Sequence, residues 1–163
     1  MRILVAGIGN VLRGDDGFGV RTIEAFATAP NRPADLTTLE TGIGGIHLVQ
    51  ELMRGYDALV LFDACDRGAE PGRLFVLEPE LPDIAALSET EKRDYFCETH
   101  YATPIRALTF AREVGVLPVL VRIIGCQISD SEAFDAAMHP AVAKAIAPAV
   151  ELAQRMVETM RSA

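Results

Sequence analysis

The chain has 163 residues, of which 50% are hydrophobic, and a formal net charge of -8. This length favours one domain, residues 1–163, with a sizeable buried core. The acidic balance argues against a nucleic-acid partner, because a phosphate backbone requires clustered Lys and Arg.

The cysteines and the apolar segments bear on the cellular compartment. Cys65, Cys97 and Cys126 lie far apart and form no Cys-x-x-Cys pair, so no structural zinc site is indicated, and such a sparse set fits a reducing environment. The N-terminal apolar run ends at Gly7, too early for a signal peptide, and no segment is long and apolar enough for a membrane span. We therefore expect a cytoplasmic protein without membrane contact, and a monomer.

Short apolar runs alternate with amphipathic segments along most of the chain. In chain order we expect a strand at 3–6, a glycine loop at 7–14, a helix through residue 26 capped by Asp15 or Asp16, a strand at 36–40, a tight loop at 41–45, a helix at 46–53, and strands at 58–62 and 73–77. An acidic stretch at 79–101 has no clear period and is expected to be irregular, as a mobile flap.

The second half continues the same alternation. Thr103 followed by Pro104 is a typical helix start, and this helix should continue to Val114. A strand is expected at 119–124 and a helical region at 140–161, broken or kinked near Pro148. The pattern predicts an α/β fold: a single three-layer domain with a mostly parallel, twisted five-stranded sheet and helices on both faces, of a phosphorylase/hydrolase-like kind. The fourth strand follows the third without a helix, so it can pair antiparallel at an edge.

Two carboxylates are expected at one edge of this sheet. Asp16 lies in the loop after the first strand, and Asp63 follows the apolar run of the third. Ligands of such folds bind beyond the carboxyl ends of the strands, where the strand order reverses. His100 lies in the irregular segment before a helix and can fold over the same edge. Two carboxylates and an imidazole suit a divalent ion such as nickel or zinc, and also activation of water by a general base.

Each of these residues also has an ordinary structural interpretation. Of the adjacent pair, Asp15 is the better candidate for a helix cap, and Asp63 can bond loop amides. A loop histidine such as His100 is most often solvated. Cys97 precedes it by three residues, but a cysteine–histidine dyad rarely comes from such close neighbours, so we expect Cys97 not to be a nucleophile.

The glycine loop begins like a dinucleotide-binding fingerprint. Its third glycine is replaced by Leu12, and no helix is expected before Asp15, so phosphate binding is weakly indicated. Gly7 and Gly9 more plausibly permit a tight turn beside the strand end.

Three segments resemble the nickel–iron hydrogenase maturation endopeptidases. The run from Gly7 to Val20 is similar to the N-terminal signature of that family, and Leu59 to Ala64 is similar to the strand that ends in a metal-binding Asp. Thr99 and His100, with Pro104 beyond, resemble the family's histidine loop. The resemblance spans nearly the whole chain and implies that Asp16, Asp63 and His100 are catalytic residues and metal ligands.

The family likeness implies a narrow task. Such enzymes remove a C-terminal extension from the hydrogenase large-subunit precursor after nickel insertion, and the nickel carried by this substrate is the recognition tag. A different divalent metal could occupy the resting site, and either Asp16 or Asp63 could activate the water. The chain departs from many members at Glu40-Thr41-Gly42, where they carry Asp-Gly-Gly, and at Tyr101, which bears on substrate preference.

Three alternatives remain open from the sequence. A protease for a diverged hydrogenase-like metalloprotein would use the same residues. A peptidyl-tRNA hydrolase-like enzyme would share the sheet and the glycine loop but would need a basic face. A non-catalytic binding domain of this fold would tolerate loss of the three residues.

Overall fold

A computed structural model describes residues 1–30, 32–97, 103–129 and 137–162, with only the backbone of Cys97. The strands are β1 (Ile3–Ile8), β2 (Thr37–Gly42), β3 (Ala58–Cys65), β4 (Leu74–Leu77) and β5 (Leu120–Gln127). The helices are a 3-10 turn η1 (Gly14–Gly17), α1 (Phe18–Ala27), α2 (Gly45–Leu52), α3 (Glu89–Cys97), α4 (Pro104–Glu113) and α5 (Pro140–Ser162).

The five strands form one sheet in the order β2-β1-β3-β5-β4. β1 pairs parallel with both β2 and β3, and β3 pairs parallel with β5. β4 is the antiparallel edge strand, paired with β5, as its position directly after β3 allowed. The order reverses beside β1, so the carboxyl ends of β1 and β3 meet at the point where ligands bind in such sheets.

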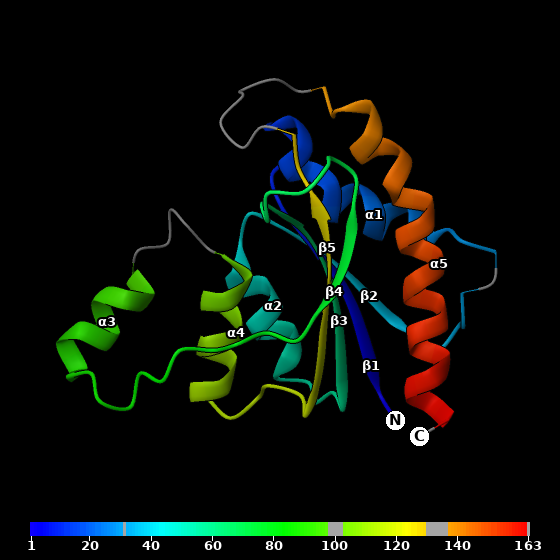
Figure 1. Cartoon of the computed structure of the whole chain (residues 1–163). Helices are drawn as coiled ribbons and strands as arrows, with labels where there is room; N and C mark the ends of the chain where they lie inside the picture. Colours follow the sequence, from blue (N-terminus) through cyan, green and yellow to red (C-terminus); the bar gives the residue numbers. More distant parts are fainter. Residues whose placement is uncertain (31, 98–102, 130–136, 163) are drawn as a thin grey trace.

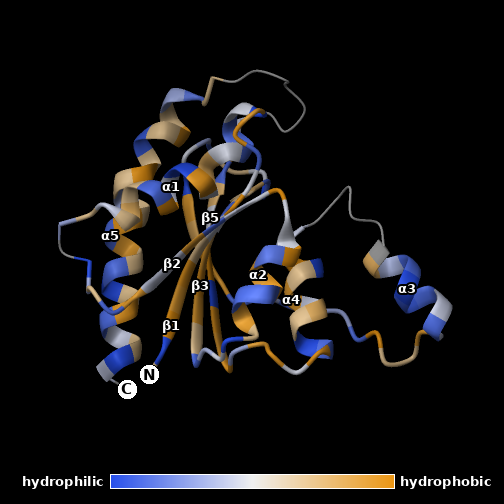
Figure 2. Ribbon diagram, turned by 180° about the vertical axis from the view of Figure 1, so that it is seen from behind, coloured by the Kyte–Doolittle hydropathy of each residue, from blue (hydrophilic) through white to orange (hydrophobic). Residues whose placement is uncertain are grey.

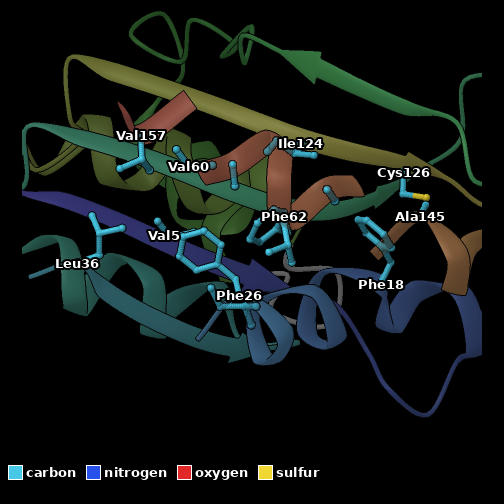
Figure 3. Close-up of a cluster of buried hydrophobic side chains, with 14 of the residues drawn as sticks. Val5, Phe18, Phe26, Leu36, Val60, Phe62, Ile124, Cys126, Ala145 and Val157 are labelled. Carbon is cyan, nitrogen blue, oxygen red and sulfur yellow. The ribbon is translucent and has the colours of Figure 1, made fainter. Parts of the chain in front are cut away.

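Helices cover both faces of the sheet and create two separate cores. α1 and α5 lie on one face, and α2 and α4 lie on the other (Figure 1). Under α1 and α5, alternate residues of the central strands pack against aromatic side chains, and Phe26 and Phe62 have ring centroids 6.0 Å apart (Figure 3). The second core joins Leu4, Leu59 and Leu61 to α2 and α4. The three-layer α/β prediction is confirmed.

The stretch that the sequence predicted to be irregular contains a helix, α3. α3 is largely hydrophilic (Figure 2) and lies beside α4 rather than over the sheet (Figure 1). It contacts α4 through its aromatic end, where the rings of Phe96 and Phe110 are 4.9 Å apart and the Arg106 guanidinium lies 5.0 Å from the Tyr95 ring centroid. The segment before it is anchored by buried Ile84, so residues 79–97 are not uniformly irregular.

The C-terminal helix also differs from its prediction. α5 is a single helix from Pro140 to Ser162 that includes Pro148, so the helix is not broken there, and of the two predicted outcomes only a kink remains. Pro148 is exposed, so the carbonyl of Lys144 that loses its helical partner can bond water instead. In the part of the chain that the structure describes, no helix has the length and apolar character to cross a bilayer.

Candidate functional site

Glycines bring the first helix unusually close to the strands. A Cβ on Gly7 would overlap the carbonyl oxygen of Gly19, and a Cβ on Gly19 would overlap the carbonyl oxygens of Ile8 and Phe62. α1 therefore crosses the carboxyl ends of β1 and β3 with backbone against backbone. This close crossing fixes the position of η1, the turn that carries Asp16 just before α1.

The loop after β1 folds back onto Asp16. Gly9 has a φ of 147°, and a Cβ there would overlap the Asp16 carbonyl oxygen. The Asn10 amide donates to the Asp16 carbonyl oxygen and to Asp16 Oδ2, both at 3.2 Å. Gly9 thus permits a tight turn around a carboxylate, as predicted, whereas Gly7 lies within β1 and permits the close approach of α1 instead.

Asp63 lies inside β3, whereas the sequence placed it just beyond the strand. β3 continues to Cys65, and Asp63 pairs with Gly125 of β5. Burial is the main cause that raises its pKa, to about 8, and the negative charge of Asp16 raises it further, while the Ala64 amide partly opposes the shift. Burial also raises the pKa of Asp16, against the Asn10 amide and the positive charge of Arg13.

The two carboxylates line one pocket at the carboxyl end of the sheet. This pocket has a volume of about 330 Å³. Its walls come from the loop after β1, the loop after β2, the end of β3 and the start of α4, and the lining residues are Ile8, Gly9, Asn10, Arg13, Asp16, Ile43, Asp63, Ala64, Thr103 and Pro104. Two acids that interact across one pocket cannot both ionise easily, so the pair can hold a proton at neutral pH or bind a cation.

The start of α4 reaches this pocket, and α4 begins at Pro104 as the sequence predicted. Thr103 is the N-cap residue, and its hydroxyl oxygen accepts a hydrogen bond from the Arg106 amide at 3.4 Å. His100, the third predicted site residue, lies outside the described residues, as does Tyr101. Its assignment stays a prediction that rests on the motif and on its position three residues before Thr103.

Asp15 does not cap a helix. Its Oδ2 accepts hydrogen bonds from the Ser129 amide at 2.8 Å and the Ser129 hydroxyl at 2.6 Å, and its Oδ1 accepts one from the His139 amide at 2.6 Å. Burial by itself would raise the pKa of Asp15, but these bonds outweigh it and hold the pKa below its ordinary value. We call this contact the Asp15 clamp. Neither η1 nor α1 has a side-chain N-cap hydrogen bond.

The clamp gives adjacent acids opposite electrostatic properties. Asp15 is held in its ionised form by three donors, whereas Asp16 and Asp63 resist ionisation. Sequence reasoning missed the structural role of Asp15 because its partners are 114 and 124 residues away. No local pattern near residue 15 could have indicated them.

The metal-ligand prediction concerns Asp16, Asp63 and His100, of which the structure describes only the two carboxylates. Within residues 1–30, 32–97, 103–129 and 137–162, no group of three His, Cys, Asp or Glu side chains is arranged to hold an ion. Cys65 follows Asp63 on β3, and burial raises the pKa of its thiol to about 11, so it is not a ready thiolate ligand.

Comparison with known proteins shows the family to which this chain belongs. A family model described as hydrogenase maturation protease matches residues 20–156. The chain belongs to the hydrogenase maturation protease family. It is 39% identical over 153 residues to the hydrogenase expression/formation protein HupD of Bradyrhizobium diazoefficiens, covering 93% of this chain and 76% of that protein. HupD of Rhizobium leguminosarum is 36% identical over 159 residues, covering 97% and 75%.

A solved structure of the same family shares the fold. The hydrogenase maturating endopeptidase HybD of E. coli superposes with a TM-score of 0.73 at 27% identity, covering 99% of this chain and 93% of that one. The chain is thus a maturation protease, a hydrolase that cleaves peptide bonds. This membership removes the peptidyl-tRNA hydrolase-like interpretation and agrees with the resemblance drawn from residues 7–20 and 59–64.

Proposed function

We propose that this maturation protease removes the C-terminal extension of a hydrogenase large-subunit precursor that already carries nickel. Asp16, Asp63 and His100 bind the substrate's nickel, and one carboxylate activates the attacking water. The observation that carries the proposal is the shared pocket at the ends of β1 and β3, in which Asp16 raises the pKa of Asp63. Family membership supports the substrate class.

A partial ligand set suits a metal that arrives on the substrate. A nickel ion held by precursor ligands has few free coordination positions, so the enzyme needs to supply only two or three donors. The two half-buried carboxylates also gain from such an ion, because its charge offsets their mutual repulsion. The binding of nickel-loaded precursor is therefore stronger than the binding of the same chain without nickel.

Cleavage of nickel-loaded precursor, compared with cleavage of nickel-free precursor, tests this proposal directly. We expect wild-type enzyme to shorten only the loaded form, as measured by intact mass. Asp16→Asn, Asp63→Asn and His100→Ala should each slow cleavage by at least roughly a hundredfold while circular dichroism stays unchanged. Asp57→Asn is the matched carboxylate control, since Asp57 is exposed at the opposite end of β3. Equal cleavage of both forms would remove metal recognition from the site.

A second mechanism is favoured by the raised pKa of Asp63. A protonated Asp63 beside an ionised Asp16 is the arrangement of an aspartic-type peptidase, in which one acid donates a proton to the carbonyl and the other activates water. This mechanism predicts that nickel-free precursor is also cut, with a rate that falls as the pH rises through about 8. This aspartic-type mechanism is excluded if cleavage requires nickel and the cleavage rate does not fall as the pH rises through about 8.

A further inference from the structure

Three large aliphatic side chains are exposed at the carboxyl end of the sheet. Leu12, Ile43 and Ile46 are 70%, 66% and 50% exposed. Leu12 lies in the loop after β1, and Ile43 lies between β2 and α2, while Ile46 is in the first turn of α2. We call these residues the apolar rim. Single exposed aliphatic residues are ordinary, but several on adjoining loops indicate a surface for a partner.

Backbone bonds hold the loops of the rim together and against the pocket. The Gly9 amide donates to the Gly42 carbonyl oxygen at 3.0 Å, which joins the loop after β1 to the last residue of β2, directly before Ile43. The Leu12 amide donates to Asn10 Oδ1 at 3.0 Å. Asn10 and Ile43 both line the pocket that contains the carboxylates. The apolar rim is therefore continuous with the candidate catalytic pocket.

Core packing does not explain why the rim residues are aliphatic. α2 buries Leu48, Val49 and Leu52 against the second core, whereas Ile46 is on the exposed side. Gly42, at φ 55°, has open space around its Cα, so the turn before Ile43 is not pressed outward by packing. A polar residue at Ile43 or Ile46 would serve folding equally well.

We propose that the apolar rim binds an extended, apolar segment of the precursor chain next to the bond that is cut. The inference rests on the proposed function, because the occupant follows from the continuity of rim and pocket. A chain held at Asp16 and Asp63 passes beside Ile43, which lines that same pocket. The rim itself carries no charge on a chain with a net charge of -8, so it selects the segment by apolar contact rather than by ion pairing.

Serine substitutions test the rim on the full chain. Leu12→Ser, Ile43→Ser, Ile46→Ser and the triple variant are assayed with nickel-loaded precursor that the wild type cleaves. We expect Ile43→Ser to raise KM by roughly tenfold and the triple variant by more, with kcat within about twofold, because the lost apolar contacts hold the bound chain equally in the ground state and in the transition state. Val119→Ser is the matched control: Val119 is 95% exposed but precedes β5 at the opposite end of the sheet.

The outcomes separate the rim from the proposed function. If wild type cleaves and the triple variant keeps its KM, the rim inference is wrong and the proposed function stands. If wild type cuts neither precursor form, the proposed function is wrong. A triple variant with unchanged KM that sediments as a smaller species than wild type would show that the rim joins two copies of this chain instead. A lower kcat at unchanged KM would also overturn the inference.

Discussion

Asp63 links folding stability to pH in the metal-free protein. Its pKa is about 8 in the folded chain, against roughly 3.9 in an unfolded one. Between these values the folded state binds a proton that the unfolded state does not, so stability decreases as pH rises from about 4 to about 8. Asp63→Asn has no such proton. We expect the free energy of unfolding of Asp63→Asn to exceed that of wild type by roughly 1–3 kcal/mol at pH 8.5 and to differ little from it at pH 5.

Urea titrations with a chelator present, at pH 5, 7 and 8.5, measure this difference. Glu80→Gln is the control, since Glu80 is an exposed carboxylate outside the pocket. An Asp63→Asn variant with the same pH slope as wild type would show that Asp63 is ionised in the folded protein.

The stability that Asp15 contributes through the Asp15 clamp depends on pH in the opposite direction. Its pKa is lowered in the folded state, so its stabilisation is complete above the unfolded pKa and is lost as pH falls through the folded one. Asp15→Asn retains one acceptor oxygen and should lower the free energy of unfolding at pH 7 by about 1–3 kcal/mol. Ser129→Ala removes one donor and should cost less. A double-mutant cycle measures the coupling, and additive effects would contradict a direct bond.

The close crossing of α1 over β1 and β3 predicts how a substitution at Gly19 changes stability. In an ordinary helix, Gly→Ala stabilises by about 1 kcal/mol. Gly19→Ala should instead destabilise by at least roughly 2 kcal/mol, because its methyl group would overlap the carbonyl oxygens of Ile8 and Phe62 and displace α1. Chemical denaturation checks the sign, with the exposed Ala147→Gly in α5 as the measure of ordinary propensity. A stabilised Gly19→Ala would show that α1 is free to shift.

α3 should be the least protected of the described helices. Its contacts with α4 are made by Tyr95 and Phe96 at one end, and few apolar contacts mean a low free energy of local opening. Amide hydrogen exchange in α3 should be much faster than in β1 and β3. Phe96→Ala should speed it further without changing exchange in the strands. Protection equal to that of the strands would contradict this prediction.

The elements show what the sequence could and could not provide. The strands around Val5 and Val60 were predictable because a buried parallel strand is a short apolar run, and α4 because Thr103 and Pro104 are local signals. α3 was missed because a polar helix without an apolar stripe has no period to detect, and its Phe96 contact lies in another helix. The shared pocket of Asp16 and Asp63 followed from topology alone, whereas the pKa of Asp63 required its burial.

We expect the protein to be a single chain in solution. Outside the apolar rim, large exposed hydrophobic residues such as Val76, Val114 and Val119 lie on different elements. A stable dimer interface buries about 1,200–2,000 Å², and a charge of -8 on each copy opposes association. We expect a species of 17.6 kDa in sedimentation equilibrium. A concentration-independent dimer would contradict this prediction.

The Asp15 clamp also bears on when a newly made chain can become active. Asp15 leaves the ribosome well before its partner amides, which belong to Ser129 and His139. During synthesis the turn that carries Asp16 therefore lacks its fixing contacts until α5 has begun to emerge. A nascent chain without that helix would hold an unfinished pocket, so protease activity should begin only after α5 has been synthesised.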